Sequence, residues 1–278
     1  MMRGQLHGAN GFLHQAIALA HQSNNTQAII YTYSLMANLA YVQGHLDNAE
    51  KLFKVAMSFM LSGGTPQDDN GVIEMSLKLA TIYAGQEKND LAKMGFQFCT
   101  ESLEAKLEKF NELPAEEQSE ELRKETRLLL GLTLDSHARY MVAIHRLSQA
   151  VVDYKQALLI CQEEQGQTHP QSLVLMSDLA TILDMQGRHD EALPLVKQAV
   201  ELSREAGHPD QHVLLGNMAG ILLHNDLFEE SVKVYKEALA LAQSAGDEEA
   251  VEQIQEGLKE VGNRRKAQKA EAAKNKTD

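Results

Sequence analysis

Residues 173–206, LVLMSDLATILDMQGRHDEALPLVKQAVELSREA, contain the pattern that decides the fold. In the second half of this stretch the small residue Ala192 is followed four positions later by Val196 and seven positions later by Ala199. In the first half the pair Leu179-Ala180 precedes Gly187. Residues three and four positions apart lie on one face of an α-helix, and a glycine between two such faces permits a sharp turn. The stretch therefore predicts two helices that fold back on each other.

The same pattern recurs along the chain, with a small residue, a large residue four positions later and a small residue seven positions later. It occurs at Ala49-Phe53-Ala56, Ala92-Phe96-Cys99, Ala150-Tyr154-Ala157, Ala192-Val196-Ala199 and Ser231-Tyr235-Ala238. About twelve residues upstream stand the pairs Met36-Ala37, Leu79-Ala80, His137-Ala138, Leu179-Ala180 and Met218-Ala219, and Gly44 takes the turn position of Gly187. Small residues where two helix backbones touch are typical of tetratricopeptide repeats.

A single helix pair cannot bury its apolar stripe alone, so several pairs must stack. We therefore predict an all-α fold, a tetratricopeptide-repeat αα-solenoid of about five helix pairs with an N-terminal half-repeat and a C-terminal capping helix. The half-repeat, Ala9-Leu13-Ala16, would leave Phe12, Leu13 and Ile17 on an open face. The capping helix carries a stripe of Val251, Ile254, Leu258 and Val261. The predicted solenoid covers residues 1–262, with repeats near 30–63, 73–106, 131–164, 173–206 and 212–245 and the cap at 248–262.

The repeats are spaced more widely than the family unit of about 34 residues. From Ala49 to Ala92, Ala150, Ala192 and Ser231 the steps are 43, 58, 42 and 39 residues. The extra length predicts loops at 61–70, 108–124, 163–172 and 205–211, with His169-Pro170 and His208-Pro209 shaping the last two. Residues 263–278 hold six basic and two acidic residues and are expected to form a disordered basic tail.

Composition narrows the function classes. The net charge of −13 argues against nucleic acid as a partner. No apolar run approaches the ~20 residues that span a bilayer. Peripheral membrane association through the basic tail stays open as an alternative. The two cysteines, Cys99 and Cys161, stand inside apolar helical patterns and are expected to be buried free thiols.

No catalytic signature is present. The sequence lacks His-Glu-x-x-His, Gly-x-Ser-x-Gly, a phosphate-binding glycine loop and Cys-x-x-Cys. His7, His14 and His21 recur every seven residues, but no cysteine or carboxylate completes a metal-ligand set around them. We therefore predict a protein that is not an enzyme and that needs no cofactor or metal.

The binding surface of such a solenoid is lined by the first helix of each pair. Counting from the small residues, the predicted peptide-binding groove contains Asn38, Tyr41, Asp135, Arg139, Asp178, Asp184 and Asn217, and Ser34, Ser177, Thr181 and His224 are expected to face it as well. This set lacks the several lysines and arginines that capture a C-terminal carboxylate. An acidic groove favours basic partner segments instead.

Four stretches carry a resemblance that generic repeats do not share. They are AIIYTYSLMANLA (28–40), LDNAEKLFK (46–54), IEMSLKLA (73–80), and THPQ (168–171) followed by VLMSDLAT (174–181). Taken in order, they resemble the mitochondrial tetratricopeptide repeat protein 19 family over roughly residues 12–258.

This resemblance implies a protein bound at the mitochondrial inner membrane that supports respiratory complex III. The implied partner is the Rieske iron–sulfur subunit or its fragments, and a role in cell division is also attached to the family. Residues 1–46 contain one arginine and no acidic residue, which is not a recognisable transit peptide, so a cytoplasmic location is an alternative for the chain as written. The rival function is a cytosolic peptide or cargo adaptor similar to kinesin light chain repeats, which share the long period and the His-Pro loops.

Overall fold

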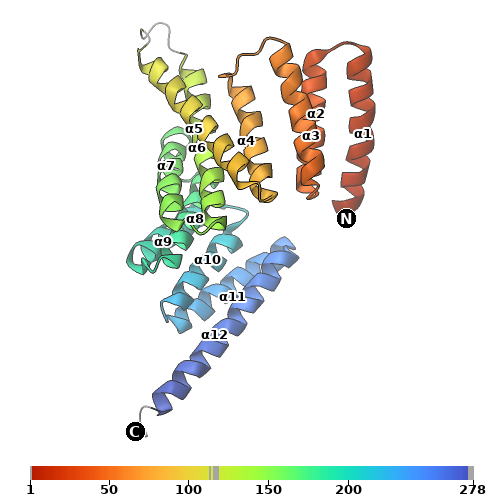
Figure 1. Ribbon diagram of the computed structural model, residues 1–278. Helices are drawn as coiled ribbons and strands as arrows, with labels where there is room; N and C mark the ends of the chain where they lie inside the picture. The colour runs from red at the N-terminus through yellow and green to blue at the C-terminus, as the bar shows by residue number, and fades with distance from the viewer. Residues whose placement is uncertain (1, 113, 115–118, 275–278) are drawn as a thin grey trace. The chain divides into compact units, whose positions relative to one another are not determined.

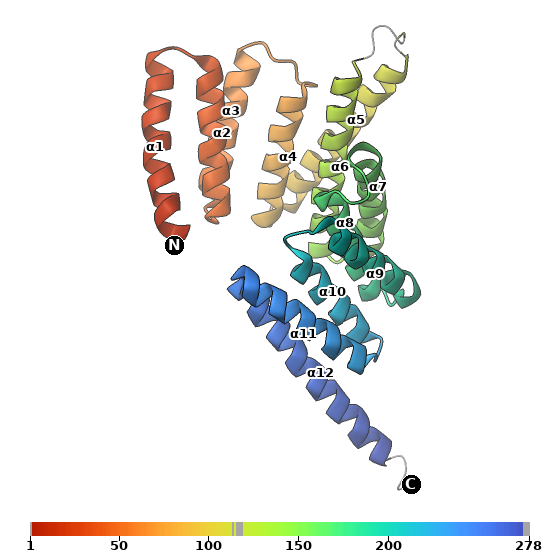
Figure 2. The same ribbon diagram turned by 180° about the vertical axis from the view of Figure 1, so that it is seen from behind.

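The computed structural model describes residues 2–112, 114 and 119–274, and within them the secondary structure is entirely helical (Figures 1 and 2). The helices are α1 (Met2–Gln22), α2 (Thr26–Val42), α3 (Leu46–Ser62), α4 (Asn70–Gly85), α5 (Asn89–Glu112), α6 (Glu120–Ala143), α7 (Leu147–Gln165), α8 (Pro170–Met185), α9 (His189–Ala206), α10 (Gln211–His224), α11 (Phe228–Ala245) and α12 (Glu248–Lys274). They form two compact units, residues 1–140 and residues 141–278. The predicted all-α helix-pair fold is confirmed.

Helix pairs form where the small residues predict them. α2 packs on α3 and α4 on α5 in the first unit, and α8 packs on α9 and α10 on α11 in the second. The small residues are completely buried, which lets the backbones approach closely. They include Ala37, Ala49, Ala80, Ala92, Ala180, Ala192, Ala219 and Ala238, each 0% exposed.

The turns inside the pairs share one backbone conformation. Gly44 and Gly187 have φ values of 75° and 73°, in the left-handed region that glycine adopts without a steric cost. The equivalent turns use Glu87, His145 and Asp226, whose φ values are 60°, 58° and 58°. The glycine turns are confirmed, and the fold imposes the same conformation on side chains that adopt it less readily.

The loops between pairs are shaped by the His-Pro motifs as expected. His169 caps α8, because its ring Nδ1 accepts a hydrogen bond from the Gln171 N–H at 3.2 Å, and Pro170 is the first residue of the helix. In the same way His208 Nδ1 accepts from the Asp210 N–H at 3.1 Å. The first motif therefore begins α8, whereas the second shapes the loop just before Asp210, the N-cap residue of α10.

Three expectations need correction. The predicted loop at 108–124 is shorter, because α5 continues to Glu112, where buried Phe110 holds its last turn in the core, and α6 begins at Glu120; residues 113 and 115–118 lie outside the described residues. Residues 263–274 are not a disordered tail but extend α12 beyond the expected cap, and 275–278 lie outside the described residues. In α1, Phe12 is 73% exposed, whereas Leu13 and Ile17 are half-buried because α1 packs on α2.

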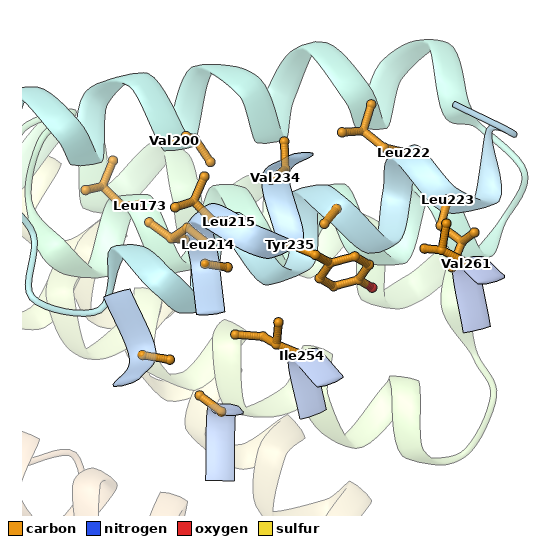
Figure 3. Close-up of a cluster of buried hydrophobic side chains, with 14 residues drawn as sticks. Leu173, Val200, Leu214, Leu215, Leu222, Leu223, Val234, Tyr235, Ile254 and Val261 are labelled. Carbon is orange, nitrogen blue, oxygen red and sulfur yellow. The ribbon is translucent and has the colours of Figure 1, made fainter. Parts of the chain in front are cut away.

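The core of the second unit contains side chains from α10, α11 and α12 (Figure 3). The apolar stripe of α12 lies where the sequence predicts it. Ile254 and Val261 are 4% and 1% exposed, and Val251 and Leu258 pack against the same cluster. In this way α12 covers the end of the last helix pair.

Two further expectations concern single features. Cys99 and Cys161 are both buried free thiols, as expected. Among the described residues, no helix combines the length and the apolar character needed to cross a membrane.

Candidate functional site

A cavity of about 270 Å³ opens in the second unit, between the first helices α8 and α10 and the capping helix α12. Asp184 from α8 and Asn217 from α10, two of the predicted groove residues, both line it. Thr181 and His224, which were also expected to face the groove, line it as well. The structure therefore brings together polar residues that are up to 43 positions apart in the sequence.

The carboxylate of Asp184 is the buried charged group of this cavity. Its side chain is 3% exposed, and it accepts hydrogen bonds from two histidines. His189 Nδ1 lies 2.7 Å from one oxygen, and His224 Nδ1 binds the other. A carboxylate removed from water requires such partners, so the two imidazoles hold Asp184 in place at the cavity wall.

The neighbouring polar groups are fixed by hydrogen bonds of their own. The Asn217 amide donates to Ser177 Oγ at 2.9 Å, and the Thr181 hydroxyl donates to the Ser177 carbonyl at 3.0 Å. On the other side His212, which is 3% exposed, has its Nε2 3.0 Å from Asp247 Oδ2. These bonds leave little rotational freedom in the cavity wall.

Two glycines of α10 make room for the cavity. Gly216 and Gly220 stand four residues apart on the helix face that lines it. A Cβ atom at Gly216 would meet only Ile254 Cγ1 at 3.8 Å, and one at Gly220 would meet only the Tyr235 hydroxyl at 3.6 Å. Both are ordinary contacts, so packing does not require glycine at either position.

A smaller cavity of about 150 Å³ lies in the first unit, lined from α2, α4 and α6. The predicted groove residues Asn38 and Tyr41 line it together with Lys78 and Ser136. Tyr41 is 42% exposed, so its ring stands at the surface. The first helices of this unit thus also border a recess with polar walls.

The other predicted groove residues are placed differently. Asp135 is buried and bound by Arg139, whose Nε donates to Asp135 Oδ1 at 3.0 Å within α6. Asp178 is half-buried on α8 and does not line the larger cavity. Asp135 and Arg139 therefore form an ion pair within one helix, and the cavities include neither them nor Asp178.

Sequence reasoning missed several lining residues. His212, Gly216, Gly220, Tyr235 and Ile254 were absent from the predicted groove, and Lys78 was absent from the smaller one. A usable signal was the pair Gly216 and Gly220, since glycine is unfavourable inside a helix unless space is needed. No such signal in the sequence indicated that α12 lines the cavity, because its apolar stripe is also what a simple capping helix requires.

The histidine stripe near the N-terminus has local partners. His14 Nδ1 lies 2.8 Å from the Asn10 carbonyl oxygen, and His21 packs edge-on against Tyr33. In the part of the chain that the structure describes, no cluster of three or more His, Cys, Asp or Glu residues is placed to hold a metal ion.

Stacked helix pairs with recesses along their first helices define a tetratricopeptide-repeat protein, a class of protein–protein interaction scaffolds. In agreement, a sequence model of the tetratricopeptide repeat matches residues 132–205. The relatives are more specific. The chain is 74% identical over 267 residues to tetratricopeptide repeat protein 19, mitochondrial, of Danio rerio, and 49% identical over 205 residues to its namesake in Homo sapiens. The chain belongs to the mitochondrial tetratricopeptide repeat protein 19 family.

The chain is shorter than these relatives. The matches cover 96% of this chain and 66% of the zebrafish protein, and 74% of this chain and 54% of the human protein. A third relative, from Drosophila melanogaster, is 25% identical over 207 residues.

Solved structures with low sequence identity share the fold. BtubC from P. vanneervenii has a TM-score of 0.67 at 15% identity, covering 89% of this chain and 93% of that one. The kinesin light chain repeats of Podospora anserina have a TM-score of 0.55 at 18% identity, covering 78% of this chain and 96% of that one. At these identities the likeness concerns the fold alone.

Proposed function

We propose that this chain is a non-catalytic scaffold that holds segments of partner proteins along its first helices. The observation that carries the proposal is the pair of recesses, one in each unit, on helices that the repeat class uses for binding. Asn38 and Tyr41 would contact the bound segment in the first unit, and Asp184 and Asn217 would contact it in the second. Asp135, Arg139 and Asp178, which lie on the same first helices, would set the charge of the surface around them.

The charge of the protein suggests what these surfaces prefer. Residues 141–278 contain 14 basic and 22 acidic residues, and the whole chain carries −13. Such a field attracts basic segments and raises their rate of encounter, an effect that salt weakens. We therefore expect the partner segments to be basic.

Family membership supports a more specific role. The relatives are named mitochondrial, and we propose that this chain acts at the mitochondrial inner membrane, where it supports the assembly and maintenance of respiratory complex III. Its partner there would be the Rieske iron–sulfur subunit or fragments of it, which the scaffold would hold during their clearance. Attachment to the membrane would be peripheral, either through the surface of this chain or through another protein.

Restoration of complex III tests this role. The chain, fused to an inner-membrane targeting sequence, is expressed in cells that lack the family member, and complex III activity and Rieske fragments are measured. We expect activity to return and fragments to decrease, and crosslinking followed by mass spectrometry to recover the Rieske subunit with the scaffold. A cytosolic version of the same chain is the control and should restore nothing.

One outcome would contradict the role. If the targeted chain reaches the inner membrane, resists limited proteolysis as a folded protein does, and still leaves complex III deficient, the complex III assignment fails for this chain. Supplying the remaining residues of the zebrafish relative then shows whether the missing activity resides in the part of the relative that this chain does not match.

A further inference from the structure

Gly216 and Gly220 keep the cavity of the second unit open against the preference of their own helix. Glycine inside a helix is roughly 1 kcal/mol less favourable than alanine. Because alanine would fit at both positions at 3.6–3.8 Å from its nearest neighbour, neither packing nor backbone conformation explains the glycines. What the two glycines do provide is empty volume beside Asp184 and Asn217. The volume itself is therefore the feature to explain.

The hydrogen bonds that fix the wall also decide what the wall presents to a ligand. The Asn217 amide nitrogen donates one N–H to Ser177 Oγ, which leaves its second N–H as a donor and its carbonyl oxygen as an acceptor. The Thr181 hydroxyl donates its proton to a backbone carbonyl, which leaves its oxygen lone pairs. His224 donates from Nδ1 to Asp184, which leaves Nε2 as an acceptor in the neutral ring. Asn217, Thr181 and His224 thus each offer an acceptor to the cavity, and Asp184 adds a negative charge.

The cavity lining also contains apolar and aromatic side chains. Val213 and Ile221 of α10 lie one turn to either side of Asn217 on the same helix face, and Tyr235, Ile254 and the polar Gln253 complete the lining. Tyr235 is 7% exposed, and its hydroxyl lies against Gly220, 3.6 Å from the position that a Cβ atom would take there. Burial raises the pKa of Tyr235, so the hydroxyl is protonated at neutral pH. An aromatic ring also attracts a cation placed over its face.

Hydrogen-bond acceptors and a carboxylate, interleaved with apolar and aromatic side chains in one cavity wall, complement one side-chain chemistry. A guanidinium group offers five N–H donors and no acceptor, carries a permanent positive charge, and stacks on aromatic rings. Its three-carbon stem suits the apolar side chains. Size agrees as well, since a cavity of roughly 150 Å³ accommodates benzene and this one measures about 270 Å³.

We propose that the cavity between α8, α10 and α12 is an anchor pocket for an arginine side chain of the bound segment. Asp184 supplies the charge, Asn217, Thr181 and His224 accept the N–H groups, and Gly216 and Gly220 supply the space. The inference rests on the proposed scaffold function and adds the identity of the residue that the scaffold reads.

Peptide binding to the full chain tests the pocket without reference to complex III. The probe is a fluorescein-labelled Gly-Ala-Ala-Arg-Ala-Ala-Gly peptide, followed by anisotropy at low salt. Three matched peptides replace the arginine by citrulline, lysine or norleucine. We expect the arginine peptide to bind at least about tenfold more tightly than the citrulline peptide, which has the same shape without the charge. Equal binding of the arginine, citrulline and norleucine peptides would overturn the proposal. Tighter binding of the lysine peptide would overturn arginine specificity and show that the pocket selects positive charge.

Two variants separate the pocket from folding. Gly216→Ala/Gly220→Ala places two methyl groups in the cavity and improves the helix, so we expect Tm to rise by about 2–4 °C for each glycine while the affinity for the arginine peptide falls at least about tenfold. Asp184→Asn should also weaken binding, whereas Asp190→Asn, which removes the same charge from an exposed site, should leave the affinity within about twofold. Unchanged affinity in both cavity variants would overturn the pocket.

The two proposals fail separately. If the chain binds the arginine peptide through Asp184 but does not restore complex III, the pocket is supported and the complex III role is contradicted. A targeted Gly216→Ala/Gly220→Ala chain that restores complex III fully shows that the function does not need the pocket, and this overturns arginine anchoring as part of the function.

Discussion

Gly95 of α5 lies directly against Ala80 of α4. A Cβ atom built on Gly95 would stand 2.7 Å from the Ala80 Cβ, closer than such atoms approach in real proteins, and a tight 3.3 Å from the Ala80 Cα. Ala80 itself is completely buried. The two backbones therefore touch at a point where one methyl group is already the limit, and this contact sets the separation of the pair.

The contact predicts a cost for Gly95→Ala. Alanine improves helix propensity by up to about 1 kcal/mol, but the added methyl forces the helices apart, and we expect a net loss of about 1–3 kcal/mol in unfolding free energy. Urea unfolding followed by circular dichroism measures it. Ala80→Gly in the same chain restores the space, so the double variant should recover part of the loss. A Gly95→Ala chain more stable than the parent would contradict the contact.

Large side chains at the small residues of the second unit should also destabilise the protein. Ala180 and Ala219 are both 0% exposed in contacts between helices. Leucine at either position overpacks the contact and should lower the free energy of unfolding by about 1–3 kcal/mol. Leucine at Ala245, the last residue of α11, serves as the exposed control. Thermal unfolding measures the loss. Unchanged Tm values at both positions would contradict the placement of these alanines in the helix–helix contacts, on which the fold assignment depends.

The sequence predicts the helix pairs well because their contacts depend on local spacing. The alanines at Ala49, Ala92 and Ala192 repeat with their partners at fixed intervals, and all are completely buried. The cavity depends instead on three helices that are distant in the sequence. Part of its wall is formed by Gly216 and Gly220, which have no side chains. Missing atoms leave no hydrophobic pattern. Asp184 was predicted as a groove residue, but its burial between two histidines was not predicted, because His224 lies on another helix.

The turn conformations predict two opposite substitution effects. Glu87 has φ 60° and Gly187 has φ 73°, at equivalent turns of two helix pairs. A left-handed conformation costs a non-glycine residue roughly 1–2 kcal/mol, partly offset by the greater freedom of glycine in the unfolded chain. We expect Glu87→Gly to stabilise the protein by about 0.5–1 kcal/mol, and Gly187→Ala to destabilise it by a similar amount. Urea midpoints of the two variants provide the comparison, and effects of the same sign would contradict it.

An ion pair in the first unit predicts how stability depends on pH. Glu50 accepts from Lys54 Nζ at 2.6 Å and from Lys88 Nζ at 2.9 Å, with its side chain 14% exposed. The Lys54 ammonium first, and then Lys88 and Gln86, hold the pKa of Glu50 at about 2, against the opposing effect of burial. The pKa is lower in the folded state than its ordinary value of 4.5, so the unfolded chain takes up the proton first as the pH falls.

The stabilisation from Glu50 is therefore complete above about pH 4.5 and is lost as the pH falls toward about 2. Because both lysines are substantially exposed, solvent screens the pair, and we expect a contribution of about 1 kcal/mol rather than the full value of the shift. Other carboxyl groups titrate in the same range, so the measurement is a difference. Urea unfolding of the parent and of Glu50→Gln at pH 7, 5, 4 and 3 should show a gap that is constant down to about pH 5 and narrows below it. Glu74→Gln, at an exposed carboxyl of α4, is the matched control and should show a smaller gap. A gap that widens as the pH falls would mean that Glu50 is not the proton acceptor that the geometry indicates.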